Sequence, residues 1–381
     1  AEIVETVLDD CLLNEVGAAV IISGGFAEVG NHRLQERITD MAREASFPFI
    51  GPNCLGIHCP TKFDTLFLPS ERIIRPELGN LAFISQSGGI LVDQMLKFAG
   101  EGIGMSAGVS IGNKALIREI DLLKYFDQDP ATRVIAFYIE GFAENEGRHF
   151  VQAAQASPKP KVVLKAGKSA GGVTAASSHT ASMAGDYQVF SEIMKQYSIA
   201  EARNELDFTA FCESLSCFDQ RSIQGRVGII SLSGGHGVVA VDTCIAHGLE
   251  VPQLLKETRE TLREKLNPAI QGIASLQNPV DLTGSSIDSD FLAAADILSR
   301  CQEVDSILVL LLPYSPGTSP DIGAKLSLIQ QRNDKPMVAY VPKEEKYRII
   351  VEGFELYNVP VSSTLEGSVQ MLEALKRCRK C

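Results

Sequence analysis

Two stretches of the sequence are closely alike, Phe83-Ile-Ser-Gln-Ser-Gly-Gly-Ile-Leu-Val-Asp93 and Ile229-Ile-Ser-Leu-Ser-Gly-Gly-His-Gly-Val-Val239. In each, an apolar run ends in Ser-x-Ser-Gly-Gly and is followed by a helix-like run. A short apolar run bounded by glycine is typical of a buried strand. Because the two stretches lie about one domain length apart, they indicate an internal repeat of a strand–turn–helix unit.

The same alternation of strands and helices continues on both sides of these stretches. It predicts α/β domains with parallel sheets. The expected strands are residues 18–22, 81–85, 134–138, 161–164, 227–231, 306–312 and 336–341. The expected helices are residues 34–45, 91–99, 121–126, 187–196, 205–218 and 368–376.

Polar loops at residues 69–76 and 220–225 divide the chain into three predicted pieces, residues 1–70, 71–220 and 221–381. The second and third pieces have the usual size of a domain, and we expect two flavodoxin-like domains that face each other. The first piece lacks the Gly-x-Gly-x-x-Gly turn with which a Rossmann-like fold begins. It therefore resembles the second half of such a fold.

Composition excludes several classes of protein. The chain has 381 residues, 45% of them hydrophobic and 22% charged, which is typical of a soluble globular protein. No apolar run approaches the roughly 18 residues of a membrane helix. With a net charge of −12 and scattered basic residues, the chain is not expected to bind nucleic acid or a membrane.

Cysteine usage predicts a cytoplasmic protein. The chain has 9 cysteines, an odd number that argues against a secreted disulfide framework. One Cys-x-x-Cys occurs, Cys378-Arg-Lys-Cys381, but no second pair has matching spacing. We therefore interpret this segment as a solvated tail and expect no metal site.

The two Ser-Gly-Gly turns are candidate phosphate sites. A helix N-terminus presents unpaired N–H groups, and glycine lets the backbone approach an anion closely. A tight βα turn without a ligand is the alternative for either turn alone. The candidate phosphate-binding residues are Ser87, Gly88, Gly89, Ser233, Gly234 and Gly235.

His179 is the candidate nucleophile. It lies in a stretch of small residues, 165–186, which predicts a mobile or exposed loop. Imidazole attacks phosphoryl groups readily, and the neighbouring Ser178, Thr180 and Ser182 suit an anion site. The alternative is a solvated loop histidine of no functional importance.

Glu140 is the second candidate catalytic residue. It stands at the end of the expected strand 134–138, where α/β enzymes place active residues. A carboxylate that accepts a hydrogen bond from one imidazole nitrogen leaves the other nitrogen free to attack. A helix cap or a solvated strand end is the alternative.

Several motifs in order along the chain resemble the ADP-forming (NDP-forming) acetyl-CoA and acyl-CoA synthetases, relatives of succinyl-CoA synthetase. The motifs are Gly51-Pro-Asn-Cys-Leu-Gly56, Ser85-Gln-Ser-Gly-Gly89, Gly112-Asn-Lys114, Ser178-His-Thr-Ala-Ser-Met-Ala-Gly-Asp186, Ser233-Gly-Gly-His-Gly237 and Asn278-Pro-Val-Asp-Leu-Thr-Gly284. The resemblance implies that residues 1–70 are half of a CoA-binding domain and that two succinyl-CoA-synthetase-like domains follow.

The resemblance also implies an activity and its residues. The family interconverts acyl-CoA, ADP and phosphate with the free acid, ATP and CoA, through an acyl phosphate and a phosphohistidine. In this chain His179 matches the phosphorylated histidine and Glu140 the glutamate that holds it. Asn53 and Cys54 match residues beside the CoA thiol.

The resemblance implies partners as well. The family's ATP-grasp module, which binds ADP or ATP and is expected to hold Mg²⁺, has no counterpart in this sequence. A partner subunit or a fused segment is therefore expected, together with a small carboxylic acid, phosphate and oligomerisation. The alternative function is a non-catalytic acyl-CoA-sensing module, as in protein lysine acetyltransferases.

Overall fold

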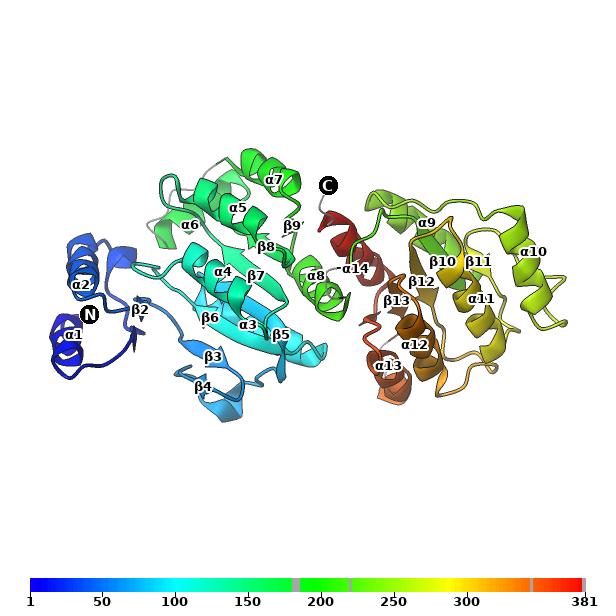
Figure 1. The fold of residues 1–381 in the computed structure, drawn as a ribbon, viewed down its shortest axis with the longest axis horizontal. Coiled ribbons are helices and arrows are strands. Elements are labelled where there is room, and N and C mark those ends of the chain that lie inside the picture. The colour runs from blue at the N-terminus through cyan, green and yellow to red at the C-terminus, as the bar shows by residue number, and fades with distance from the viewer. Residues whose placement is uncertain (180–185, 219–220, 343–344, 379–381) are drawn as a thin grey trace. The chain divides into compact units, whose positions relative to one another are not determined.

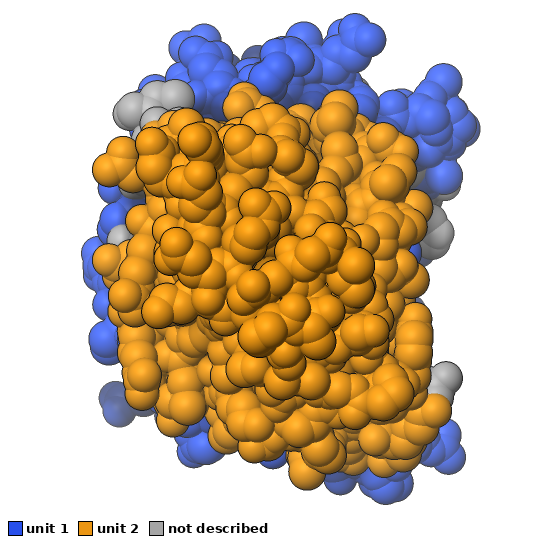
Figure 2. Space-filling model, turned by 90° about the vertical axis from the view of Figure 1, so that its right-hand side faces the viewer, with its two compact units in different colours: residues 1–212, 380 blue, residues 213–379, 381 orange. Residues whose placement is uncertain are grey.

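The computed structural model describes residues 1–179, 186–218, 221–342 and 345–378, and no side chains from 176 to 179. The chain divides into two compact units (Figure 2), here called unit 1, Ala1–Cys212, and unit 2, Glu213–Arg379. The three-domain division predicted from the sequence stays a prediction.

Unit 1 is built on a seven-stranded sheet with the strand order β4-β3-β6-β5-β7-β8-β9 (Figure 1). The strands are β3 (Ile57–Cys59), β4 (Phe63–Asp64), β5 (Leu78–Ser85), β6 (Met105–Ser110), β7 (Val134–Ile139), β8 (Lys161–Lys165) and β9 (Ala200–Ala202). The five strands from β6 to β9 in this order are parallel, whereas β3 pairs antiparallel with β6 and β4.

The helices of unit 1 connect these strands. They are α3 (Gly88–Gly100), α4 (Glu119–Gln128), α5 (Glu146–Ala156), α6 (Ala170–His179) and α7 (Tyr187–Gln196), and α8 (Glu205–Phe218) begins in unit 1 and ends in unit 2. The central strand β5 is apolar and fully buried from Leu81 to Ile84, as expected of a parallel strand covered on both faces. A short 3₁₀ helix, η2 (Ser70–Arg72), precedes β5.

The first fifty residues form a small separate layer of unit 1. It has a two-stranded parallel sheet of β1 (Ala19–Val20) and β2 (Phe49–Ile50), with α1 (Val4–Leu13), η1 (Ala27–Val29) and α2 (His32–Glu44). Phe26, Ile38 and Phe49 form its core and are fully buried. It is a small α/β arrangement with one parallel strand pair, and the partial Rossmann-like piece expected over residues 1–70 stays a prediction.

Unit 2 is a five-stranded parallel sheet with the order β11-β10-β12-β13-β14. Its strands are β10 (Val227–Ser231), β11 (Val280–Asp281), β12 (Ser306–Leu310), β13 (Met337–Tyr340) and β14 (Val361–Ser362). Its helices are α9 (Gly234–Ala246), α10 (Lys256–Lys265), α11 (Asp288–Arg300), α12 (Ile322–Arg332), α13 (Arg348–Glu355) and α14 (Leu365–Arg377), with the 3₁₀ helix η3 (Glu345–Tyr347). Helices α9 and α14 pack together, and α10 to α13 pack in a row (Figure 1).

The two sheets share one topology. Numbered from β5, unit 1 has the order 2-1-3-4-5 over β6-β5-β7-β8-β9, and unit 2 has the same order when numbered from β10. This is the flavodoxin-like order, in which ligands bind where the chain leaves strand 1 in one direction and strand 3 in the other. The predicted fold class is therefore confirmed.

Most expected elements are present, but one expectation is wrong. Residues 165–186 were expected to be a loop, whereas residues 170–179 form helix α6. The hydroxyl of Ser169 accepts from the N–H of Gly172 at 3.1 Å in its first turn, and alanine favours the helical backbone. Residues 180–185 lie outside the described part of the chain. Among the described residues, no helix is long and apolar enough to cross a membrane.

Candidate functional site

The turn between β5 and α3 is organised by two serines. The hydroxyl of Ser85 accepts from the N–H of Ser87 at 3.2 Å and donates to the carbonyl of Ser87 at 2.6 Å. Ser87 caps α3, because its hydroxyl accepts from the N–H of Ile90 at 3.4 Å. Gly88 and Gly89 are the first residues of the helix, where N–H groups have no helical partner.

The turn between β10 and α9 repeats the two hydrogen bonds of the first serine, although its second serine, Ser233, does not cap the helix. The hydroxyl of Ser231 accepts from the N–H of Ser233 at 3.0 Å and donates to the carbonyl of Ser233 at 2.8 Å. Gly234 and Gly235 begin α9, and the Nδ1 atom of His236 lies 3.1 Å from the Ser233 hydroxyl. The internal repeat predicted from the sequence is confirmed in this detail.

A pocket of about 760 Å³ in unit 1 opens at the carboxyl ends of β5 and β7. Six of the residues singled out from the sequence line this pocket. They are Asn53, Cys54, Ser87, Gly88, Gly89 and Glu140. Gly172 and Ala175 of α6 form another part of its wall. Ala175 lies four residues before the end of that helix at His179. The pocket therefore lies at the switch point of the flavodoxin-like sheet.

Glu140 follows the last residue of β7 and has polar neighbours on both sides. The side chain of Tyr138 hydrogen-bonds to the carboxylate of Glu140, and the pKa of Tyr138 is raised by burial and by the negative charge of Glu140. Lys165, at the end of β8, donates from Nζ to the carbonyl of Glu140 at 2.7 Å. Burial lowers the pKa of Lys165, although Glu140 opposes that shift.

Asn53 and Cys54 differ in what they offer to a ligand. The Cys54 side chain is buried, and its Sγ donates to the carbonyl of Ile21 at 3.4 Å. Burial raises the pKa of Cys54 to about 11, so the thiol is protonated at neutral pH and is a poor nucleophile. Asn53 is exposed, with φ of 57°, and its Nδ2 donates to Oδ1 of Asn113 at 3.2 Å.

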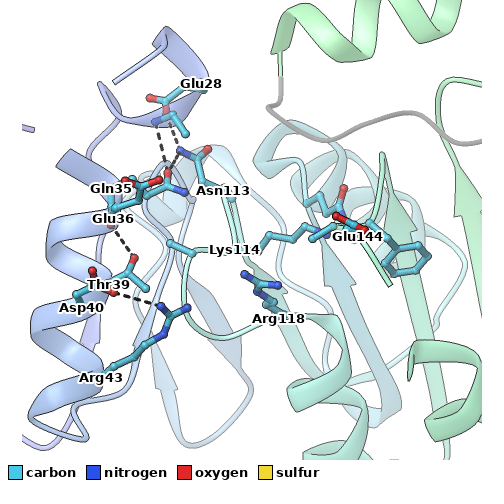
Figure 3. A pocket seen from close by; sticks show the side chains of 16 residues that line it. Glu28, Gln35, Glu36, Thr39, Asp40, Arg43, Asn113, Lys114, Arg118 and Glu144 are labelled. Atoms are coloured by element: carbon cyan, nitrogen blue, oxygen red, sulfur yellow. Dashed lines mark hydrogen bonds and ion pairs between the residues drawn. The ribbon is translucent and has the colours of Figure 1, made fainter. Parts of the chain in front are cut away.

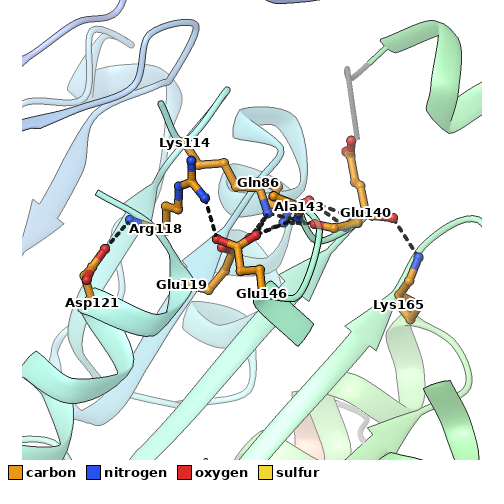
Figure 4. Close-up of polar contacts among 10 residues, drawn as sticks. Gln86, Lys114, Arg118, Glu119, Asp121, Glu140, Ala143, Glu146 and Lys165 are labelled. Carbon is orange, nitrogen blue, oxygen red and sulfur yellow. Dashed lines mark hydrogen bonds and ion pairs between the residues drawn. The ribbon is translucent and has the colours of Figure 1, made fainter. Parts of the chain in front are cut away.

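Behind the pocket lies a buried polar network that sequence reasoning missed (Figure 4). Lys114 donates to Glu119 at 2.7 Å, to the carbonyl of Gly141 at 2.7 Å and to Glu146 at 3.3 Å. Burial alone would raise the pKa of Glu146, but Lys114, the Ala143 N–H and Arg118 outweigh it and the pKa is lowered. Lys114 was noticed only as part of a motif: Glu119 is five positions away, but Glu146 is 32 positions away, so the cluster of the three has no local signal.

A second pocket of unit 1, about 430 Å³, lies between α2 and the loop that follows β6 (Figure 3). Its wall mixes acidic and basic side chains, among them Glu36, Arg43 and Arg118. Asn113 lines it and is also bonded to Asn53, so the walls of the two pockets are connected. Gln86 lines both pockets.

For the other predicted site residues, the described structure gives no position relative to this pocket. His179 ends α6, but its side chain lies outside the described atoms. Ser233, Gly234 and Gly235 belong to unit 2. Among the described residues, no group of His, Cys, Asp and Glu could hold a metal ion.

Comparison with known proteins places these features in context. The family described as a succinyl-CoA ligase-like flavodoxin domain matches residues 78–215. An ADP-forming acetate–CoA ligase of Archaeoglobus fulgidus is 36% identical over 82% of this chain and 44% of its own length. The alpha subunit of ADP-forming acetate–CoA ligase I of Pyrococcus furiosus is 32% identical over 100% of this chain and 81% of its own.

A solved structure is also similar. Acetyl-coenzyme A synthetase 1 of Ca. Korarchaeum cryptofilum, described as dinucleotide-forming and solved with phosphate and ADP, superposes with a TM-score of 0.87 at 30% identity. The match covers 98% of this chain and 80% of that one. This chain thus spans less than half of the Archaeoglobus relative and about four fifths of the other two.

Proposed function

Because the chain belongs to the family of ADP-forming acetate–CoA ligases, we propose that it is the acyl-CoA-handling part of an NDP-forming acyl-CoA synthetase. The proposed reaction interconverts acyl-CoA, ADP and phosphate with a carboxylic acid, ATP and CoA. Its named relatives are ligases, and none of the observations favours the alternative of an acyl-CoA-sensing module.

The proposed chemistry has three balanced steps. A phosphate oxygen attacks the thioester carbonyl, the C–S bond breaks, and CoA leaves as its thiol to give an acyl phosphate. A nitrogen of His179 then attacks phosphorus, the P–O bond to the acyl group breaks, and the carboxylate leaves. ADP finally takes the phosphoryl group from the phosphohistidine and becomes ATP.

One observation carries this proposal: the turn at Ser87, Gly88 and Gly89 and the carboxylate of Glu140 line the same pocket. Free N–H groups at the start of α3 suit a phosphoryl group, since they add partial positive charge without a competing side chain. Helix α6, which lines this pocket at Ala175 and ends at His179, supports the assignment of the nucleophile.

Further roles are proposed for the other candidate residues. Glu140 accepts a hydrogen bond from the His179 imidazole and leaves the second nitrogen free to attack. Asn53 and the neutral Cys54 bind the thioester end of CoA or the acyl group, with Cys54 as a wall and not as a nucleophile. Ser233, Gly234 and Gly235 are proposed to bind the phosphoryl group as well, on the strength of the repeated turn.

The nucleotide step requires a part that this sequence does not contain. We propose that an ATP-grasp subunit or fused domain supplies the ADP and Mg²⁺ sites, as the alpha-subunit description of the Pyrococcus relative suggests. An oligomeric assembly and a cytoplasmic location remain expectations from the sequence.

The proposal is tested by incubating the chain with ³²P-labelled acetyl phosphate and digesting it for peptide mapping. We expect one phosphate at His179 that is labile in acid and stable in base, as a phosphoramidate is. His179→Ala should lose the label and keep its fold. Glu140→Gln should slow labelling by about 100-fold, the size of a misplaced catalytic group.

A matched control is available on the surface of unit 1. His149 on α5 is exposed and lies outside both pockets, so His149→Ala should label at the wild-type rate. A wild-type protein that stays unlabelled, with labelling also absent when an ATP-grasp partner and ATP are supplied, would contradict the proposed function and favour the sensing module.

A further inference from the structure

Gln86 lies between Ser85 and Ser87 in the first turn, and every donor and acceptor of its side-chain amide forms a hydrogen bond. Its Oε1 accepts from the N–H of Glu140 at 2.7 Å and from the N–H of Gly141 at 3.2 Å. Its Nε2 donates to the carbonyl of Gly141 at 2.9 Å and to the carboxylate of Glu119. These four bonds exhaust the two donors and two acceptor sites of a glutamine amide.

Three of the four hydrogen bonds of Gln86 end on backbone groups that lie outside the sheet. β7 ends at Ile139, so the N–H groups of Glu140 and Gly141 leave the sheet just where the pocket begins. The main chain adds one more link, from the N–H of Gln86 to the carbonyl of Tyr138 at 3.3 Å. The turn and the segment that bears Glu140 are therefore joined by this main-chain bond and by the side chain of Gln86, which is only 6% exposed.

A rigid support lies behind this side chain. Glu119, which accepts from Gln86, is fully buried and also pairs with Lys114, whose ammonium reaches the carbonyl of Gly141 as well. Figure 4 shows Gln86 between this cluster and Glu140. Because the partners of Gln86 are themselves fixed, the amide has one orientation available.

The internal repeat shows that the turn does not itself need an amide here. By strand register, Ser85 pairs with Tyr138 in unit 1, and Ser231 pairs with Leu310 in unit 2. Gln86 therefore corresponds to Leu232. By the same register, Glu140 corresponds to Leu312.

Both leucines are buried, at 5% and 4% exposure, and the turn around Leu232 keeps the two hydrogen bonds of its first serine, Ser231. At these two corresponding positions, unit 1 therefore has the polar residues Gln86 and Glu140 where unit 2 has two leucines. Because the turn in unit 2 forms around Leu232, the turn in unit 1 does not need glutamine in order to fold. We therefore assign the role of Gln86 to the groups that its amide binds, Glu140 and Gly141.

We propose that Gln86 is a positioning residue that fixes Glu140 relative to the phosphate-binding turn at Ser87–Gly89. This inference rests on the proposed function, since it gives Glu140 its place beside a phosphoryl group. Gln86 acts through Glu140 and Gly141, by accepting from their N–H groups and donating to the Gly141 carbonyl, and does not touch the reacting atoms.

The test is Gln86→Leu, which introduces the residue that the same turn carries in unit 2. Labelling by ³²P-acetyl phosphate should slow by about 100-fold, the cost of a displacement of about 1 Å at a catalytic group. The matched control is Gln94→Leu. Gln94 is fully buried on α3, bonds to Thr209 and lines neither pocket, so its variant should label within about twofold of wild type.

Two readouts separate positioning from a general structural role. Because Gln86 acts through Glu140, the double variant with Glu140→Gln should label no more slowly than Glu140→Gln alone. Hydrogen exchange should also speed up at least tenfold at the amides of residues 140 and 141 in Gln86→Leu, and not in Gln94→Leu. If Gln86→Leu does not fold, Gln86→Asn takes its place in this test. Its amide is one methylene too short, so hydrogen exchange at the amides of residues 140 and 141 should also speed up.

The outcomes that overturn the inference differ from those that overturn the proposed function. Independent, multiplying effects of Gln86→Leu and Glu140→Gln, or unchanged exchange at residues 140 and 141, would refute positioning by Gln86. Failure of the wild-type chain to label, both with acetyl phosphate and with an ATP-grasp partner and ATP, refutes the proposed function, and the exchange measurement still decides whether Gln86 holds this segment.

Discussion

Lys114 is the charge around which the buried polar groups of unit 1 are arranged. Its side chain is 11% exposed, and it balances the carboxylates of Glu119 and Glu146, which are 0% and 5% exposed. Buried ions are costly to remove from water, so removal of one partner leaves the other uncompensated. The geometry behind the pocket therefore depends on the ionisation of these residues.

A pH dependence follows for Glu146. Its pKa lies below the ordinary value of 4.5, so the folded state favours the carboxylate. The stability it contributes is present above about pH 4.5 and is lost as the pH falls through the lower folded pKa. Glu146→Gln should cost about 1–3 kcal/mol in the free energy of unfolding near pH 7, and progressively less below pH 4.5.

Urea unfolding of the wild type and Glu146→Gln at several pH values measures this difference. Glu44→Gln on the exposed end of α2 is the control and should change stability by less than about 0.5 kcal/mol at every pH. A constant difference between wild type and Glu146→Gln from neutral to acid pH would contradict the assigned role of the ion pairs.

At the scale of elements, the start of α3 combines a tight contact with an open face. A Cβ on Gly88 would lie 2.6 Å from the Cγ and Cδ1 atoms of Leu55. On Gly89 the nearest atom would be the Ser87 hydroxyl, at 4.0 Å. The first glycine is required by packing, whereas the second leaves space above the helix N-terminus.

Gly88→Ala and Gly89→Ala should therefore have opposite signatures. Gly88→Ala should lower the free energy of unfolding by about 1–3 kcal/mol, since Leu55 must move. Gly89→Ala should be neutral or stabilising by up to about 1 kcal/mol, because alanine is the better helix former. Its added methyl group should instead slow labelling of His179 by acetyl phosphate.

Denaturant unfolding and labelling rates of both variants give the comparison. Equal losses of stability in Gly88→Ala and Gly89→Ala would show that the contact with Leu55 does not decide the residue at position 88. Equal labelling rates in Gly89→Ala and wild type would remove Gly89 from the phosphate site.

At the scale of the whole molecule, each unit has its own apolar core. The buried cluster of unit 2 runs from Ile230 to Val361, and those of unit 1 lie between Leu8 and Ile199. In unit 2, His247 links α9 to α14 because its Nδ1 lies 2.7 Å from Glu373 and its Nε2 lies 2.6 Å from Glu366. Independent cores are the usual mark of separately folding domains.

We expect two transitions in scanning calorimetry of the intact chain. Glu146→Gln should lower the midpoint of one transition, because it removes a buried ion pair of unit 1, and His247→Gln should lower the other, because it removes a buried hydrogen bond of unit 2. A single transition that both variants shift together would show that the units unfold as one.

Local pattern was enough for most of the framework. The run Val-Gly-Ile-Ile-Ser at 227–231 was expected as a strand and forms β10, and residues 187–196 and 205–218 were expected as helices and form α7 and α8. Strand 134–138 also predicted the position of Glu140, since a polar residue directly after a buried strand falls at the sheet edge. The helix at residues 170–179 was not predicted, because small residues show no apolar periodicity.

Sequence by itself thus determined the α/β class, the repeated turn, and the type of residue at each strand end, because these follow from interactions between near neighbours in the chain. Tertiary structure decided which of those ends meet. Gln86 and Glu140 are 54 positions apart, and Lys114 and Glu146 are 32 apart. Gln86 meets Glu140 because the parallel strands β5 and β7 lie side by side, and Lys114 meets Glu146 because β6 and β7 flank β5 on its two sides. No local signal encodes this strand order.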